Sequence, residues 1–147
     1  MIKIIATLLT IFAFNISHAK TVNVGIILGF TGPIESLTPD MAAGAELAFT
    51  EASNSGKLLN GSNINIIRAD STCIDSAAAT SAAEGLVSQG VTAIMGADCS
   101  GVTGAILSNV AVPNGVPMIS PSATSPGLTT AEDNGLFFRT APSDARG

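Results

Sequence analysis

The chain of 147 residues has neither tryptophan nor tyrosine, and it contains a single histidine, His18. This histidine lies near the N-terminus, in an apolar leader, so the rest of the chain cannot build a Ser-His-Asp or Cys-His arrangement from its own side chains. The nucleotide-binding patterns G-x-G-x-x-G and G-x-x-x-x-G-K-S/T are also absent. A G-x-S-x-G nucleophile turn is excluded at residues 96–101, because Asp98 stands where that turn needs glycine. These absences predict a protein that is not an enzyme.

Charged residues are scarce, and the basic ones form no stripe. Six Lys and Arg stand against eleven Asp and Glu, which gives a formal net charge of −5 at pH 7. Nucleic-acid binding requires clustered basic side chains, so no nucleic-acid partner is expected. Asp70 and Asp75 are isolated from other metal ligands, and they are predicted to cap turns or helices. The sequence therefore predicts no metal and no cofactor.

The N-terminal segment has the pattern of an export signal. Lys3 supplies one positive charge, residues 4–16 are almost wholly apolar, and Ser17 and Ala19 place small residues at a cleavage site. The alternative is a membrane anchor, but a spanning helix needs roughly 20 apolar residues and this run has about 13. We therefore expect residues 1–19 to be a cleaved signal peptide, and a mature periplasmic chain that begins at Lys20.

The two cysteines are Cys73 and Cys99. An even number of cysteines in an exported chain favours a disulfide, because the periplasm is oxidising. The alternative is a pair of buried, unbonded thiols, and the sequence leaves it open.

Five apolar runs, the first four of which contain Val or Ile, predict strands along the mature chain; a helical pattern follows each of the first three, and two more strands come after them. Such runs are typical of strands buried on both faces of a parallel sheet, and the helices between them predict right-handed crossovers. We therefore predict an α/β fold with a doubly wound parallel sheet. Asp40 is the expected N-cap of the first helix, and Asp75 or Ser76 that of the second. The predicted strands are Val22–Leu28, Ile64–Ala69, Val91–Met95, Val116–Ile119 and Leu136–Arg139, and the predicted helices begin near Asp40, Asp75 and Val102.

Ligands bind parallel sheets of this kind beyond the carboxyl ends of the strands. The predicted loops there are residues 29–39, 70–75, 96–101 and 120–126. Ser100 lies where the third helix begins, and free amides at a helix start favour an anion such as a carboxylate. Hydroxyl groups in the fourth loop would complete a neutral site. The alternative, that Ser100 only caps its helix and the fourth loop is a solvated turn, stays open.

Four segments of the chain match the pattern of one known protein family. They are residues 24–33, which end in Thr-Gly-Pro, Gly96-Ala97-Asp98-Cys99-Ser100, residues 118–129 (MISPSATSPGLT) and residues 138–140. In these segments the chain resembles the branched-chain amino-acid binding proteins of the Leu/Ile/Val type, which serve ABC importers. Residues 24–33 resemble the opening of that family, the second and third segments resemble its two ligand loops, and residues 138–140 fit its continuation. The stretch 118–129 is the most specific of these motifs.

The resemblance implies a type I periplasmic-binding-protein fold, in which two α/β lobes close on a ligand like a trap. Residues 20–140 would form most of the first lobe. Residues 141–147, with Ser143 or Asp144 as a helix cap, would begin the hinge crossing to a second lobe that this sequence does not contain. A disulfide like Cys73–Cys99 also occurs in some members.

The family's ligand residues carry over to five positions. The resemblance implies that Ser100 contacts the α-carboxylate of the ligand. Backbone groups at Ser122 and Ala123 and the hydroxyl and amide of Thr124 would meet the carboxylate and the ammonium group. Leu37 falls where several members have an aromatic residue that covers the ligand side chain, which leaves branched-chain specificity open. The acidic residue that usually meets the ammonium group is expected in the second lobe.

The function expected from this resemblance is delivery of amino acids, branched-chain or related amides among them, to an ABC importer. Its expected partners are a small-molecule amino acid and the membrane permease of the importer, and the complete protein is expected to be a monomer. One alternative is the extracellular ligand-sensing domain of a receptor with the same lobes. Another is an exported enzyme whose catalytic base lies beyond Gly147.

Overall fold

The structure is a computed structural model that describes residues 20–146; the predicted signal peptide, residues 1–19, lies outside them. Five strands form one sheet in the order β2-β1-β3-β4-β5, and every neighbouring pair is parallel. The predicted parallel α/β sheet is therefore confirmed. The strands are β1 Thr21–Leu28, β2 Asn63–Asp70, β3 Val91–Gly96, β4 Met118–Ser120 and β5 Phe137–Arg139.

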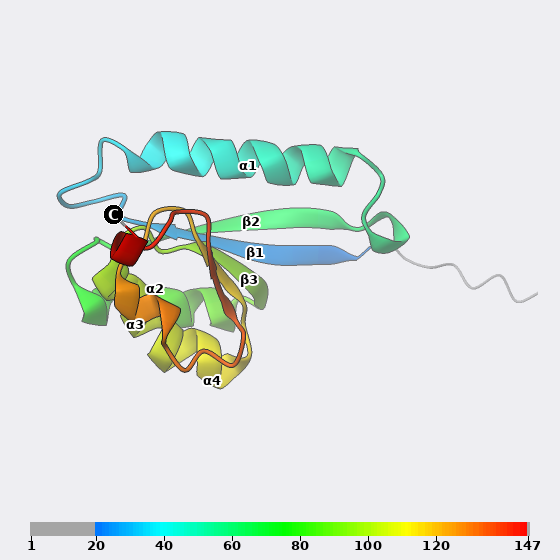
Figure 1. The fold of residues 1–147 in the computed structure, drawn as a ribbon. Helices are drawn as coiled ribbons and strands as arrows, with labels where there is room; N and C mark the ends of the chain where they lie inside the picture. Colours follow the sequence, from blue (N-terminus) through cyan, green and yellow to red (C-terminus); the bar gives the residue numbers. More distant parts are fainter. Residues whose placement is uncertain (1–19, 147) are drawn as a thin grey trace, which may run out of the picture.

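Helices lie on both faces of this sheet, as a doubly wound fold requires. α1 (Thr38–Asn54) lies along one face, and α2 (Ser76–Ser88), α3 (Ser100–Ile106) and α4 (Val112–Asn114) lie along the other (Figure 1). The π-helical turn η2 (Leu107–Ala111) joins α3 to α4, and three short 3-10 turns complete the chain: η1 Leu59–Gly61, η3 Pro126–Thr129 and η4 Asp144–Arg146. Within residues 20–146, none of the helices has the length and apolar character to cross a membrane.

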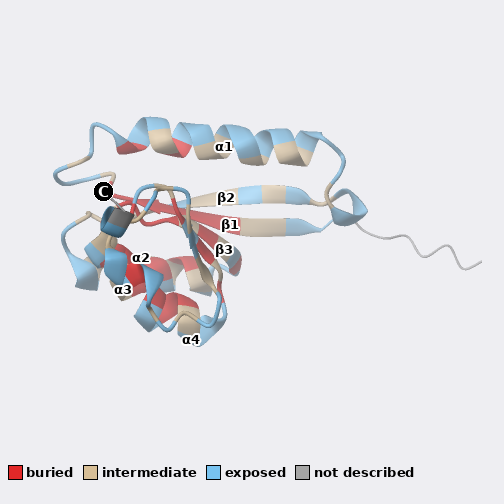
Figure 2. Ribbon diagram, in the orientation of Figure 1, coloured by how far each residue is buried: buried red, intermediate tan, exposed pale blue. Residues whose placement is uncertain are grey.

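The sheet separates two apolar cores, seen as the buried regions in Figure 2. The larger core packs Ile27, Ile94 and Met118 of the strands against α2 and α3. The smaller core packs Ile26 and Leu28 of β1 against α1. β1 is buried without interruption from residue 24 to its end, because it lies between β2 and β3 and is covered on both faces. Burial of each large aliphatic side chain contributes about 1.5–3 kcal/mol.

The face that α1 covers is left partly open over β4 and β5. Ile119 and Phe138 are register partners on these strands, and they are 44% and 57% exposed. These two side chains therefore present apolar surface at this end of the sheet.

The start of α1 differs from the prediction. The helix begins at Thr38, two residues before Asp40, and its N-cap is Leu37, which makes no side-chain cap. Thr38 is fully buried, and its Oγ1 donates a hydrogen bond to the Gly29 carbonyl at 3.0 Å. This contact with a distant residue, together with proline in the first turn, fixes the helix start earlier. Asp40 therefore lies in the first turn and is not the cap.

The second helix begins as predicted. Asp75 is its N-cap, and its Oδ1 accepts hydrogen bonds from the amides of Ala77 at 2.9 Å and Ala78 at 3.0 Å. This Asp75 cap satisfies two amides that have no partner inside the helix.

The third helix is longer than predicted. It begins at Ser100 rather than Val102 and continues through η2 and α4 to Asn114. A proline inside a helix lacks the amide hydrogen that the regular hydrogen-bond ladder needs, and the wider π-helical turn ends at Ala111, two residues before Pro113. Gly115 then ends the run with φ of 65°, a left-handed conformation that favours glycine.

Candidate ligand-binding site

The loops that follow β2 and β3 are joined covalently. Cys73 and Cys99 form a disulfide with their Cα atoms 5.2 Å apart, which confirms the predicted bond and excludes the free-thiol alternative. Cross-linking residues 26 positions apart stabilises a fold by roughly 3 kcal/mol in the chain-entropy model. The disulfide holds Cys99 immediately before the first residue of α3.

Ser100 is the first residue of α3 and binds the loop after β4. Its Oγ accepts hydrogen bonds from the amides of Thr124 at 3.1 Å and Ser125 at 3.0 Å. The helix N-cap is Cys99, which makes no side-chain cap. The alternative that Ser100 only caps its own helix is therefore wrong. Because the N-cap side chain accepts no hydrogen bond, the amides of the first turn of α3 are not capped.

Thr124 is anchored to the segment that follows β5. Its Oγ1 donates to Asp144 Oδ2 at 2.9 Å, and the Asp144 amide donates to the Thr124 carbonyl at 3.0 Å. The sequence suggested Asp144 only as a helix cap. The contact between Asp144 and Thr124 could have been found from the sequence, because Asp144 follows the last parallel strand. The carboxyl ends of parallel strands lie at one edge of the sheet, so this carboxylate should lie near the other strand-end loops.

Ser122 and Ala123 differ in exposure although they are adjacent. Ala123 is fully buried, and its amide donates to Ser120 Oγ at 2.9 Å. Ser122 is exposed, and its Oγ donates to the Asp98 carbonyl at 3.0 Å. Within residues 20–146 no hydrogen bond reaches the Ser122 carbonyl. That oxygen remains available to a ligand.

Of the five predicted ligand residues, four lie together and one lies apart. The amides of Thr124 and Ser125 donate to Ser100 Oγ, which connects Ser100 with the loop that also carries Ser122 and Ala123. Leu37 is 62% exposed, at the start of α1, and it is not part of this hydrogen-bonded group. Its predicted contact with the ligand side chain stays a prediction.

Arg139 was not predicted as a site residue, yet it supports the fourth loop from β5. Its Nη1 donates to the Ser125 carbonyl at 2.9 Å and the Ala123 carbonyl at 3.3 Å, and its Nη2 donates to Thr129 Oγ1. The guanidinium group is therefore occupied by backbone oxygens of the fourth loop and by the Thr129 hydroxyl of η3. Such multiple donation is the ordinary use of arginine where a fixed geometry is needed.

Two carboxylates hold the other loops. Asp98 is buried and accepts three hydrogen bonds. Asp70 accepts from Thr31 Oγ1 at 2.6 Å and from the Thr72 amide at 2.8 Å, which confirms its predicted role in capping a turn. Burial opposes ionisation of Asp70, but the hydrogen bonds from Thr31 and Thr72 outweigh it, so the pKa of Asp70 lies below its ordinary value. In the described part of the chain, no three His, Cys, Asp or Glu side chains form a metal-binding group.

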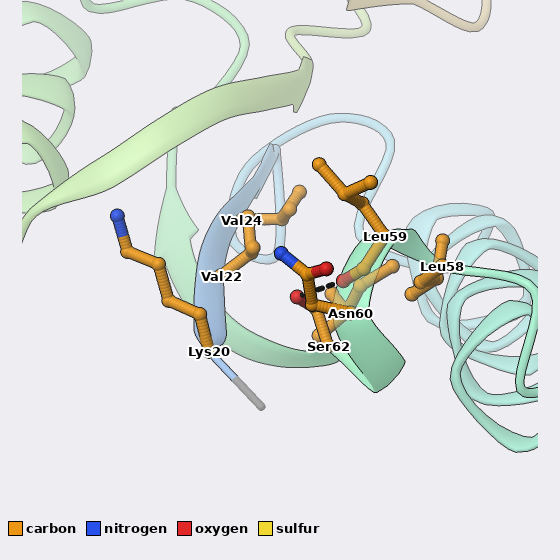
Figure 3. Close-up of a pocket in the computed structure, with 8 residues that line it drawn as sticks. Lys20, Val22, Val24, Leu58, Leu59, Asn60 and Ser62 are labelled. Atoms are coloured by element: carbon orange, nitrogen blue, oxygen red, sulfur yellow. Dashed lines mark hydrogen bonds between the residues drawn. The ribbon is translucent and has the colours of Figure 1, made fainter. Parts of the chain in front are cut away.

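A cavity of about 390 Å³ lies at the opposite end of the sheet. Lys20, Val22 and Val24 of the first strand region line it from one side, and Leu58 and Leu59 line it from the other (Figure 3). Its lining is mainly apolar, and it includes none of the predicted ligand residues. The polar groups that can orient a small molecule instead converge at the carboxyl ends of the strands.

Comparisons with known proteins show the family to which the chain belongs. The family model described as periplasmic binding protein matches residues 21–147. The Leu/Ile/Val-binding protein BraC3 of Rhizobium johnstonii is 34% identical over 125 residues, which cover 84% of this chain and 33% of the relative. The chain thus spans about a third of the length of such relatives.

Solved structures show the same fold. The substrate-binding protein LivJ of the branched-chain amino acid transporter from Streptococcus pneumoniae, in complex with isoleucine, matches with a TM-score of 0.74 and 33% identity, over 86% of this chain and 35% of that one. A solute-binding protein from R. palustris in complex with benzoate matches with a TM-score of 0.71 and 26% identity, over 86% and 34%. With the family model matching nearly all of the described residues, this chain belongs to the periplasmic binding protein family.

Proposed function

We propose that this chain supplies the first-lobe half of a periplasmic solute-binding protein that delivers an amino acid to an ABC importer. Residues 20–140 form most of that lobe, and residues 141–147 begin the crossing to a second lobe. The observation that carries the proposal is the hydrogen-bonded group in which the amides of Thr124 and Ser125 donate to Ser100 Oγ and Ser122 Oγ donates to the Asp98 carbonyl. The names of the relatives, which are Leu/Ile/Val-binding proteins, support the amino-acid class.

The hydroxyl group of Ser100 suits the α-carboxylate of the ligand. A serine oxygen can accept two hydrogen bonds and donate one. Both acceptor positions are taken by the amides of Thr124 and Ser125, and no acceptor within residues 20–146 receives the Ser100 proton. That proton is therefore available to a carboxylate oxygen. The uncapped first-turn amides of α3 add further donors on the same side.

The neighbouring loop suits the ammonium group. Because the Thr124 hydroxyl gives its proton to Asp144, its oxygen is left as an acceptor. The unpaired Ser122 carbonyl is a second acceptor, and the Asp144 carboxylate adds negative charge beside them. A donor at Ser100 and acceptors at residues 122–124 match the two charged groups of a zwitterion. The second lobe would supply the remaining contacts and exclude water on closure.

This polarity favours an amino acid over a plain carboxylic acid. The benzoate carried by one structural neighbour has a carboxylate but no ammonium group. Such a ligand would leave the acceptors at Ser122 and Thr124 unpaired, and unpaired polar groups in a closed site weaken binding. Leu37 is exposed, and its predicted contact would give the ligand side chain an aliphatic surface that suits leucine or isoleucine. The same contacts hold a solute without changing it, so the proposed protein binds and does not catalyse.

Isothermal titration calorimetry on the complete protein tests this proposal. L-Leucine, L-isoleucine and L-valine are compared with D-leucine and benzoate, which keep the carboxylate but misplace or lack the ammonium group. We expect saturable binding of one L-amino acid per protein. Both controls should bind at least about tenfold more weakly, because each loses one to two hydrogen bonds. Equal or tighter binding of benzoate would show that the site selects a carboxylate alone.

A further inference from the structure

Asp98 is buried, although its side chain has no part in the proposed ligand contacts. It is 3% exposed and is the only charged residue among the buried polar residues of the described chain. Its Oδ2 accepts a hydrogen bond from the Gly29 amide at 2.7 Å, and its Oδ1 accepts from the Cys99 amide at 2.8 Å and from Ser71 Oγ at 3.3 Å. Burial of a charge is unfavourable unless hydrogen bonds compensate it. Three donors directed at one carboxylate provide that compensation.

These donors come from three different loops. Gly29 follows β1, Ser71 follows β2, and Cys99 lies between β3 and α3. The backbone at Asp98 also binds the fourth loop. Ser122 Oγ donates to the Asp98 carbonyl at 3.0 Å, and Ser120 Oγ donates to the Ala97 carbonyl. The segment around Asp98 therefore joins the loops at the carboxyl ends of β1, β2, β3 and β4.

The same carboxylate controls the position of Ser100. Asp98 fixes the amide of Cys99, and the disulfide fixes its side chain. Cys99 is the N-cap of α3, so its orientation sets the direction of the first helical turn and of the Ser100 hydroxyl. That hydroxyl reaches the amide of Thr124, 24 residues away. A change at Asp98 should therefore move both Ser100 and the loop that carries Thr124 and Ser125.

We propose that Asp98 is the positioning residue of the ligand site, and that it sets ligand affinity without touching the ligand by holding the four strand-end loops in register. The ligand part of this inference rests on the proposed function. Geometry and charge predict opposite effects here. A negative charge near Ser100 repels the α-carboxylate of a ligand, so neutralising Asp98 would strengthen binding if charge alone mattered. If positioning dominates, neutralisation weakens binding.

Asp98→Asn separates the two effects, because it removes the charge with little change of shape. The amide NH2 of asparagine would face amide donors from Gly29 or Cys99 and lose at least one of the three bonds. We expect L-leucine to bind roughly tenfold more weakly or worse, as for other residues that orient binding groups. The matched control is Asp133→Asn. Asp133 also accepts from two amides, those of Gly135 at 2.8 Å and Phe137 at 3.2 Å, but in the turn before β5, at the other end of the sheet.

A second measurement does not depend on ligand. In amide NMR spectra, Asp98→Asn should shift the resonances of Thr124 and Ser125, whereas Asp133→Asn should leave them unchanged. If Asp98→Asn does not fold, Ser71→Ala takes its place, because it removes one hydrogen-bond donor from Asp98. This variant should shift the same resonances and weaken leucine binding, but both effects should be smaller. Unchanged or tighter leucine binding together with unmoved Thr124 and Ser125 signals would overturn the inference. Failure of the wild-type protein to bind any amino acid would overturn the proposed function instead, while the NMR comparison would still decide the role of Asp98.

Discussion

Replacing Ser100 with alanine removes one oxygen that serves two purposes. The oxygen accepts hydrogen bonds from the amides of Thr124 and Ser125, and both bonds are partly buried. Each such bond contributes about 0.5–1.5 kcal/mol, so the free energy of unfolding should fall by about 1–3 kcal/mol. We expect the proposed contact with the ligand carboxylate to contribute about 1.5–3 kcal/mol, so its loss should weaken binding of L-leucine roughly 10- to 150-fold.

The matched control for Ser100→Ala is Ser88→Ala. Ser88 is an exposed serine of α2, and its Oγ donates to the Gly85 carbonyl at 2.8 Å, away from the strand-end loops. Both variants are compared with the wild-type protein by calorimetry with L-leucine and by urea unfolding. The control should bind within about twofold of the wild-type affinity. If Ser100→Ala also binds within twofold, Ser100 does not contact the ligand and the proposed assignment of donors is wrong.

Three further predictions concern the scaffold of the site. Replacing Cys73 and Cys99 together with serine should lower the free energy of unfolding by about 2–4 kcal/mol, and an unchanged urea midpoint would contradict the stabilising role of the disulfide. Gly96→Ala should prevent folding or lower the melting temperature markedly, because φ is 131° and an added Cβ would lie 2.0 Å from the Ile27 carbonyl oxygen; Gly101→Ala, with open space around its added Cβ, is the control. Asp70→Asn should destabilise the protein at pH 7 but much less in acid. The pKa of Asp70 is lowered in the folded state, so its stabilising contribution is present above the unfolded value and is lost as pH falls through the folded one, below about pH 4. Urea unfolding of wild type and variant at pH 7 and about pH 2–3 measures this, and a difference that stays constant with pH would refute it.

The architecture was predictable because it depends on local patterns. The apolar run that forms β1 is nearly continuous, because this strand is covered on both faces, and that pattern indicates a parallel sheet. The Asp75 cap and the left-handed turn at Gly115 also depend on neighbours within a few residues. The disulfide was predictable from an even cysteine count in an exported chain, but its alternative could be excluded only by the fold that brings Cys73 to Cys99.

The details that the sequence did not reveal depend on distant partners. The start of α1 was misplaced because Thr38 bonds the carbonyl of Gly29, on the loop after β1. From the sequence, Asp98 was recognisable as a member of a loop that resembles a known ligand loop and as the residue that excludes a nucleophile turn. Its role as an acceptor was not, because its three hydrogen-bond donors come from three separate loops. Asp144 resembled a helix cap until the parallel arrangement of β4 and β5 placed it beside Thr124. In each case the sequence shows the type of side chain, but only the fold shows which distant group it bonds.

A crystal structure of the complete protein with bound L-leucine tests the central claim most directly. The account predicts one carboxylate oxygen of leucine within about 3 Å of Ser100 Oγ, and the ammonium group at the Ser122 carbonyl and Thr124 Oγ1. Leucine bound in the reverse orientation, or bound away from the loops at the carboxyl ends of β3 and β4, would contradict it.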